Sequence, residues 1–400
     1  MKKENSYLRI GTDYYKKGLV PLFSGDTYSA LLKWNKSEIV TDEGKDYLQE
    51  IEKYDGFCLI PSHTDYKQQI QGYYNRYEKI EHQFLMGDFP KTKAFLKHIF
   101  NEQYDLGLDY LTILWKHPTQ VLPILCLVSE ERKTGKTTFL NWLKLVFQGN
   151  MTINKNEDFR SRFNSDWASK LIVSVDEVLL DKKEDSERIK NLATAVSYKT
   201  ESKGVDKVES FFFGKFILCS NNEENFIIVD KDEIRYWVRK VPSLPDADEN
   251  PNLLNDLEKE LPYFMCFLNE RRIKSAKKTR MWFTKEQIFT KALSRLVKGN
   301  TTYLNKEIEE ILIDDFYKYD VDELKYSLSD LVEILSKNNV RASTSKVSEV
   351  LKSYFNIKSK NGSYSKYYLS ILPNSNSHFV EELKLKGRYF SFKKEDFIKD

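Results

Sequence analysis

Gly135, Lys136 and Thr137 are consecutive residues whose types suit phosphate binding. They follow an apolar run, 121–128, that has the length and the β-branched ends of a buried strand, and they precede a helical pattern of apolar residues over 139–147. A phosphate-binding P-loop requires this order of strand, turn and helix, because the N–H groups and the dipole at the start of the helix attract an anion. The residues predicted to bind ATP are Thr134, Gly135, Lys136, Thr137 and Thr138.

The residues of this loop have distinct expected roles. Lys136 would reach the β- and γ-phosphates, and the hydroxyl of Thr137 would ligate Mg²⁺. The first position of the usual pattern is glycine, whereas here it is Glu130, and this acid must point away from the phosphates. The alternative interpretation is a lysine-rich helix start that binds no ligand.

A second apolar run, 170–175, ends in Asp176 and Glu177. In an ATPase, acids at the end of a buried strand can hold Mg²⁺ and polarise the attacking water. We assign Asp176, together with Thr137, to the metal and Glu177 to the catalytic base. The alternative is that the two acids simply end a strand in solvent. Their position downstream of the P-loop favours the role in an ATPase site.

A third apolar run, 211–220, ends in Asn221. The two preceding strands also end in polar residues, so all three ends could meet at one site. An asparagine there can hold the attacking water and sense the γ-phosphate, and we predict this role for Asn221.

Arg235 and Arg239 follow this strand and are four residues apart. On a strand they share one face, because their separation is even. An arginine in this place can act as a finger that reaches the ATP of a neighbouring subunit. Alternatively, either arginine pairs with a local acid, Asp232 or Glu233.

The segment 197–210 is rich in lysine, and Lys199, Lys203 and Lys207 recur every four residues. A hairpin or loop tip with this pattern could follow the phosphate backbone of DNA. The alternative is a solvated turn.

Together, these motifs resemble those of superfamily 3 helicases. More narrowly, they resemble the helicase domain of phage and plasmid primase-helicases, which is related to the poxvirus-type enzymes. The segments that carry the resemblance are 122–144, 170–177 (KLIVSVDE), 198–226 and 233–242 (EIRYWVRKVP). The family consists of ring-forming AAA+-like ATPases that move along single-stranded DNA.

The resemblance implies functions for individual residues. Lys136, Thr137, Asp176, Glu177 and Asn221 take the roles given above. Arg235 is favoured over Arg239 as the finger, and Lys203 falls where the family contacts DNA. Two departures from the family pattern are Glu130 and the lack of a recognisable primase domain upstream.

Composition narrows the class of protein. The formal net charge of +3 is close to neutral, so any nucleic-acid surface must be local. The four cysteines are scattered without a CxxC motif, and the histidines lack metal-ligand spacing, which predicts free thiols in a reducing compartment and no structural zinc. The start of the chain lacks an apolar signal core, and no run approaches the length of a membrane span. We expect a cytoplasmic protein, encoded by a phage or plasmid of a bacterial host, that makes no membrane contact.

The expected fold class is α/β, in three parts. Residues 1–105 should form a mixed, mainly helical domain, residues 106–275 a central AAA+-like P-loop ATPase, and residues 285–400 a winged-helix-like domain and tail. In the last part, helical patterns over 329–335 and 344–355 precede two strand-like pieces joined by a turn at Asn361-Gly362. The lysines expected to contact DNA backbone there are Lys346, Lys352, Lys358, Lys360 and Lys366. Many winged helices bind proteins instead.

The function predicted from the sequence is ATP-dependent DNA unwinding or translocation in phage or plasmid replication. Hydrolysis would occur at subunit interfaces of a ring, expected to be a hexamer, with ATP and Mg²⁺ as cofactors. The expected partners are single-stranded or forked DNA and a primase or other replisome proteins. The alternatives are a replication initiator or DNA-loading ATPase with little unwinding, a packaging or defence translocase, and a non-catalytic DNA-binding scaffold in which Glu130 marks an inactive loop.

Overall fold

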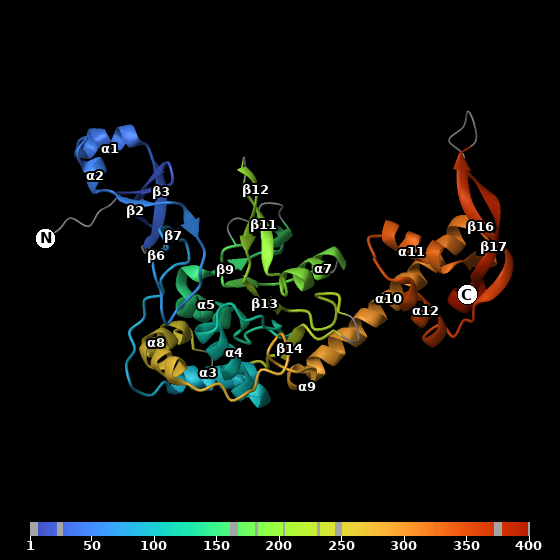
Figure 1. Cartoon of the computed structure of the whole chain (residues 1–400). Coiled ribbons are helices and arrows are strands. Elements are labelled where there is room, and N and C mark those ends of the chain that lie inside the picture. The colour runs from blue at the N-terminus through green and yellow to red at the C-terminus, as the bar shows by residue number, and fades with distance from the viewer. Residues whose placement is uncertain are drawn as a thin grey trace.

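A computed structural model of the chain describes residues 7–21, 27–160, 167–180, 183–202, 205–229, 233–244, 250–371 and 378–398 (Figure 1). Along the chain, small N-terminal sheets lead into a central parallel sheet covered by helices, and a long helix leads from there to a C-terminal helix and hairpin unit. None of the helices in these ranges combines the length and apolar character needed to cross a bilayer.

The N-terminal residues form strands more than helices. The larger sheet has the order β3-β2-β1-β4, and its elements are β1 (Tyr7–Ile10), β2 (Asp13–Pro21), β3 (Thr27–Trp34), α1 (Lys36–Glu43), α2 (Tyr47–Glu50) and β4 (Glu52–Tyr54). The smaller sheet has the order β5-β7-β6 and contains β5 (Phe57–Cys58), β6 (Gln69–Ile70) and β7 (Tyr73–Asn75). The prediction of a mainly helical region is therefore wrong for residues 7–75. Gly11, in the left-handed region at φ 59°, closes the β1–β2 hairpin. This hairpin pairs Tyr14 with Arg9 and Tyr15 with Leu8, and such pairing between strands cannot be read from helical periodicity.

The central sheet is parallel throughout and has the order β14-β8-β13-β10-β9. Its strands are β8 (Ile124–Val128), β9 (Met151–Asn154), β10 (Ile172–Val175), β13 (Lys215–Ser220) and β14 (Tyr236–Lys240). The three apolar runs predicted as strands correspond to β8, β10 and β13, and every residue of these three strands is buried. Burial on both faces explains why the runs are apolar without alternation. The prediction of an α/β fold around a buried sheet is confirmed.

Helices cover both faces of this sheet. Leu125 and Leu127 of β8 face a core built with α3 (Pro90–Phe100), α4 (Tyr104–Lys116), α5 (Lys136–Phe147) and α8 (Leu253–Glu270). Ile124, Cys126 and Val128 face the opposite core, which contains α7 (Lys183–Leu192) and the start of α10 (Lys291–Tyr319). The remaining elements are η1 (Asn101–Gln103), η2 (Gln148–Asn150), α6 (Asn156–Arg160), the hairpin of β11 (Ser197–Ser202) with β12 (Val205–Phe211), and α9 (Lys285–Ile288).

The hydrophobic cores extend the central unit beyond residues 106–275 in both directions. Tyr77, Phe89 and the apolar face of α3 belong to the core of α4, α5 and α8. At the other end, Leu293 and Leu296 of α10 belong to the α7 core. The segment 77–100 and the first turns of α10 therefore fold with the central sheet.

The C-terminal unit is built on the later turns of α10. It contains β15 (Glu323–Tyr326), α11 (Leu328–Lys337), α12 (Thr344–Ser353), β16 (Lys360–Ile371), β17 (His378–Lys393) and α13 (Lys394–Phe397). Both predicted helices are present, but the predicted turn at Asn361-Gly362 is wrong. These two residues lie inside β16, where Gly362 pairs with Gly387 in the continuous antiparallel register with β17. Pairing along this strand outweighs the local turn preference of an Asn-Gly pair.

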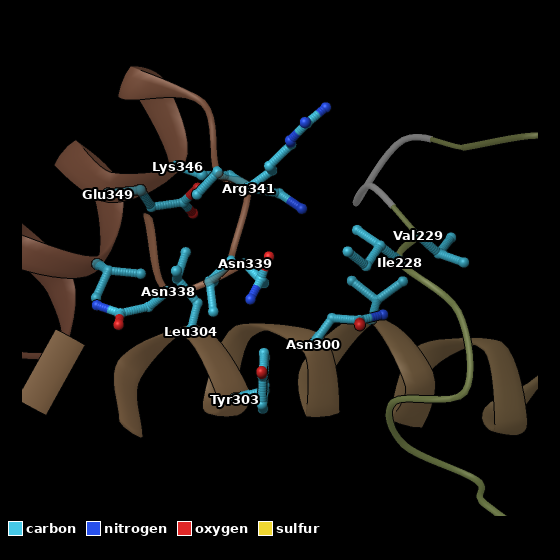
Figure 2. Close-up of a pocket in the computed structure, with 14 residues that line it drawn as sticks. Ile228, Val229, Asn300, Tyr303, Leu304, Asn338, Asn339, Arg341, Lys346 and Glu349 are labelled. Atoms are coloured by element: carbon cyan, nitrogen blue, oxygen red, sulfur yellow. The ribbon is translucent and has the colours of Figure 1, made fainter. Parts of the chain in front are cut away.

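The C-terminal unit contacts the central unit beside a cavity of about 180 Å³. Figure 2 shows Asn300, Tyr303 and Leu304 of α10 beneath it, with residues 338–349 on one side and Ile228 and Val229 on the other. Arg341, which follows α11, forms an ion pair with Glu184 of α7. The two units are therefore joined by this ion pair as well as by α10.

The buried ion pair of Arg271 with Asp109 fastens the end of α8 to α4. The Arg271 guanidinium lies 2.5 Å from the carboxylate of Asp109, which is 2% exposed. The same carboxylate accepts hydrogen bonds from the backbone N–H groups of Lys274 and Ser275. Burial raises the pKa of Asp109, but these hydrogen bonds outweigh burial and hold the pKa below its usual value.

Asp109→Ala should lower the free energy of unfolding by about 3–5 kcal/mol, because it leaves the Arg271 charge buried and unpaired. Asp105→Ala is the matched control, since Asp105 pairs with Lys274 in an exposed ion pair and should cost less than about 1 kcal/mol. Denaturant unfolding followed by tryptophan fluorescence measures both. Equal costs for the two variants would contradict the structural role of the buried pair.

Candidate nucleotide-binding site

Polar residues gather at the carboxyl edge of the central sheet. Because the strands are parallel, β8, β10 and β13 all end at this edge, with Val128 beside Ser220 and Val175 beside Leu218. A cleft of about 370 Å³ opens there. Its lining comprises residues 131–138, Asp176, Glu177, Cys219, Ser220 and Asn221. The structure thus brings together Thr134, Gly135, Lys136, Thr137, Thr138, Asp176, Glu177 and Asn221, as the sequence predicted.

The loop between β8 and α5 is held in a curled conformation. Lys133 and Gly135 both have left-handed backbone, at φ 57° and 84°. A Cβ atom on Gly135 would lie 3.2 Å from the Phe95 ring, so α3 packs closely against the loop. Nε2 of His98, also on α3, lies 3.0 Å from the Thr134 carbonyl oxygen. Glycine is therefore required at 135 for both its backbone conformation and its small size.

Lys136 is a buried cation with neutral partners. It is 7% exposed, and its ammonium donates to the Ser129 carbonyl at 3.4 Å and to the Thr134 hydroxyl at 3.1 Å. Burial lowers its pKa. The nearby carboxylates of Asp176 and Glu223 oppose this shift, but within the described ranges Lys136 forms no ion pair with either of them. A buried charge without a directly paired counter-charge is costly, so an anion entering the cleft would stabilise it.

Thr137 and Asp176 lie together as the sequence predicted for a magnesium site. The hydroxyl of Thr137 donates to the Asp176 carboxylate at 2.9 Å. Mg²⁺ takes hard oxygen ligands, commonly one or two carboxylates with phosphates and waters, and this pair fits that donor set. The described residues form no cluster of three or more His, Cys, Asp or Glu side chains that could hold a metal ion. The donor set fits a magnesium ion that arrives with a nucleotide.

Glu177 has an unusual backbone conformation that sequence patterns did not indicate. Its φ is 53°, in the left-handed region. Asn156 fastens this turn, because its side chain donates to the Glu177 carbonyl at 3.2 Å and accepts from the Leu179 N–H at 3.1 Å. Such strain, about 1–3 kcal/mol per residue, is common at functional sites. Here it accompanies a glutamate that lines the cleft.

A buried carboxylate, Glu223, ties the cleft to α10. It is 1% exposed and accepts hydrogen bonds from Lys240 at 2.8 Å and from Arg295 of α10. It also accepts a longer one, 3.4 Å, from the Glu130 N–H. Burial raises the pKa of Glu223, but the two cations outweigh burial and hold the pKa below its usual value. The Glu130 side chain is itself exposed and lies outside the cleft lining.

Sequence reasoning missed several residues of this region. Arg132 lines the cleft, and its charge within the loop was a signal that could have identified it. Glu223, Lys240 and Arg295 carried no such signal, because their contacts join segments that are distant in sequence.

Arg235 and Arg239 do not line this cleft. Arg235 directly precedes β14, so it lies where the parallel strands begin, at the end of the sheet opposite the cleft. Its guanidinium pairs with Glu233 at 2.8 Å. Arg239 is 3% exposed and pairs with Glu102 at 2.6 Å. The predicted pairing with Asp232 or Glu233 thus occurs for Arg235, whereas Arg239 pairs with Glu102, which is distant in sequence.

The lysine-rich segment forms the β11–β12 hairpin. Lys199 lies on β11, opposite Glu209 in the backbone register of the hairpin, and Lys207 lies on β12. Lys203 is outside the described residues. The hairpin stands above the central sheet in Figure 1.

Comparison with known proteins supports the fold. The family described as "Family of unknown function (DUF5906)" matches residues 127–239, which run from the end of β8 into β14 and include the cleft residues. No curated protein matches the chain. An apo structure of the C-terminal region of NrS-1 (residues 305–718) is similar with a TM-score of 0.60 and 13% identity, over 96% of this chain and 95% of that one. The A form apo structure has a TM-score of 0.57 and 15% identity over 88% and 84% of the two chains. Another A form apo structure of this region has a TM-score of 0.58 and 17% identity over 87% of this chain and 82% of that one.

The charge of Glu223 predicts a pH dependence. Because its folded-state pKa is depressed, its contribution to stability is present above its unfolded-state pKa of about 4.3 and is lost as the pH falls through the folded-state pKa. Glu223→Gln should cost about 1.5–3 kcal/mol at pH 7, and the difference from the parent should shrink below pH 4.3. The adjacent exposed Glu224→Gln is the control and should change little. Thermal unfolding of the parent and both variants across pH 7 to 3.5 measures these differences in stability. If the difference between Glu223→Gln and the parent does not depend on pH, the prediction is contradicted.

Proposed function

We propose that this chain is an ATP-driven DNA helicase or translocase that acts in phage or plasmid replication. The observation that carries the proposal is the buried ammonium of Lys136, which has neutral partners and lies beside the Thr137–Asp176 pair. A nucleotide polyphosphate would supply the direct ion-pair partner that Lys136 lacks. The likeness of fold to the NrS-1 C-terminal region is compatible with the proposal.

In this proposal each cleft residue has one task. Lys136 binds the phosphates, and the curled loop of residues 133–137 presents backbone N–H groups to them. Thr137 and Asp176 would hold Mg²⁺, and a bound Mg²⁺ would supply positive charge beside the phosphates. Glu177 accepts a proton from the attacking water, and Asn221 orients that water.

The exposed position of Glu130 supports activity over an inactive scaffold. The acid replaces the usual glycine, yet its side chain lies outside the cleft lining, and its N–H group is directed to Glu223. The acid therefore leaves the phosphate position free. An active loop is compatible with this geometry, whereas an inactive scaffold would not require Lys136, Thr137, Asp176 and Glu177 together.

A neighbouring subunit would complete the site. Arg235 lies at the sheet edge opposite its own cleft, so it can serve only a cleft in another copy of the chain. We propose a ring, of six subunits by family resemblance, in which Arg235 acts as the finger. The β11–β12 hairpin, with Lys199, Lys203 and Lys207, would contact single-stranded or forked DNA. A primase or another replisome protein is the further partner proposed.

ATP hydrolysis with and without single-stranded DNA tests the proposal. Lys136→Ala should abolish turnover and weaken nucleotide binding, whereas Glu177→Gln should bind ATP and lower turnover by about 10²–10⁴-fold, because the amide cannot accept the proton of water. Lys93→Ala removes an exposed lysine of α3 and should behave as the parent. Turnover in Lys136→Ala equal to that of the parent would remove the ATPase assignment.

Mixing two inactive variants tests the ring. Arg235→Ala should spare nucleotide binding and reduce turnover by about 10³–10⁵-fold, the value of a finger arginine. When it is mixed with Lys136→Ala, some interfaces combine an intact loop with an intact arginine, and partial activity should return. Arg239→Ala should instead reduce stability, because Arg239 is buried against Glu102. No recovery, although mixed rings form, would show that Arg235 does not act in trans.

A further inference from the structure

Lys384, Lys386 and Arg388 form a row of cations on β17. They occupy alternate positions of the strand, so they share one face, and each is exposed. Alternate residues of an antiparallel strand are about 6.8 Å apart, so the charges form an evenly spaced line. We call these three side chains the cation row, and we propose that it binds the phosphate backbone of a nucleic acid.

The residues opposite the cation row are small and uncharged. In the β16–β17 register, Ser365 pairs with Lys384, Ser363 with Lys386, and Asn361 with Arg388. Side chains of paired residues lie on the same face, so hydroxyl and amide groups border each cation. Serine and asparagine are common donors to phosphate oxygens, next to lysine and arginine. This face therefore offers a phosphate both a charge and a neutral donor.

Several other cations of the C-terminal unit have an acidic partner. Lys366, on the opposite face of the hairpin, pairs with Asp330 at 2.5 Å. Lys337 pairs with Glu333, and Lys393 with Glu395. In the described part of the chain, no acid pairs with the cation row, and the next residue on its face, Glu382, accepts a hydrogen bond from Ser365. The three side chains of the cation row are thus exposed, evenly spaced and, among the described residues, without an acidic partner.

A nucleic acid is the partner that best fits a line of equally spaced cations. Its backbone carries one negative charge per nucleotide at a regular interval, whereas a protein partner would need acidic residues at the same spacing. Figure 1 shows the β16–β17 hairpin at the far end of the molecule from the central sheet, so a strand could lie along it without obstruction by that sheet. Of the wing lysines that the sequence assigned to DNA contact, Lys366 pairs with Asp330, whereas the assignment of Lys358 and Lys360 stays a prediction. The cation row adds a candidate contact surface on β17.

Fluorescence anisotropy with labelled oligothymidylate and with a duplex of equal length tests the cation row. The combined variant Lys384→Ala, Lys386→Ala, Arg388→Ala should bind more weakly. Its slope of log affinity against log salt should shrink by up to about 2 for single strands, which is roughly 0.7 per lost contact, or by up to about 2.7 for duplex. The control variant Lys33→Ala, Lys337→Ala, Lys393→Ala removes the same charge from exposed ion pairs and should keep the parent slope.

Both variants should also be made in a chain that already carries Lys199→Ala, Lys203→Ala and Lys207→Ala, so that the β11–β12 hairpin cannot mask the result. A smaller slope with either nucleic acid supports the proposal and identifies the form that is bound. A parent-like slope and affinity with both nucleic acids, in a variant whose thermal unfolding matches the parent, overturns it. Because binding is read without hydrolysis, this outcome is independent of whether the chain is an ATPase.

Discussion

The parallel pairing of β8 with β13 and β14, and of β13 with β10, is the constraint on which the candidate site depends. Parallel strands end at the same edge, so loops that are far apart in the chain meet there. Lys136, Asp176 and Asn221 reach one cleft for this reason alone. The pairing is fixed in turn by burial, because strands apolar on both faces are stable only between the two helical layers.

Two buried charges beside this edge are balanced in different ways. Glu223 is surrounded by Lys240 and Arg295, so its charge is compensated within the protein. Lys136 has only neutral hydrogen-bond partners, so its ammonium is free to pair with an anion that enters the cleft. The carboxylate of Glu223 is thus paired within the protein and the ammonium of Lys136 is not, although both side chains are almost fully enclosed.

The helix α10 connects the cleft to the C-terminal unit. Its first turns lie along the segment that follows Asn221: Arg295 contacts Glu223, a Cβ on Gly299 would lie 2.5 Å from the Glu224 carbonyl oxygen, and the Asn300 side chain donates to Ile227. Its later turns carry Ile308, Leu312 and Phe316 into the C-terminal core. A displacement of the Asn221 loop would therefore act directly on the helix that supports the β16–β17 hairpin.

The sequence by itself determined the parts of the site that local pattern controls. Continuous apolar runs marked β8, β10 and β13, and polar residues at their ends marked the cleft, because burial and turn chemistry act within a few residues. Only the tertiary structure decided that Arg235 faces away from its own cleft, that Arg295 meets Glu223, and that Asn361 lies within a strand. These outcomes depend on which distant segments pair, and a strand or turn preference holds no information about its partner.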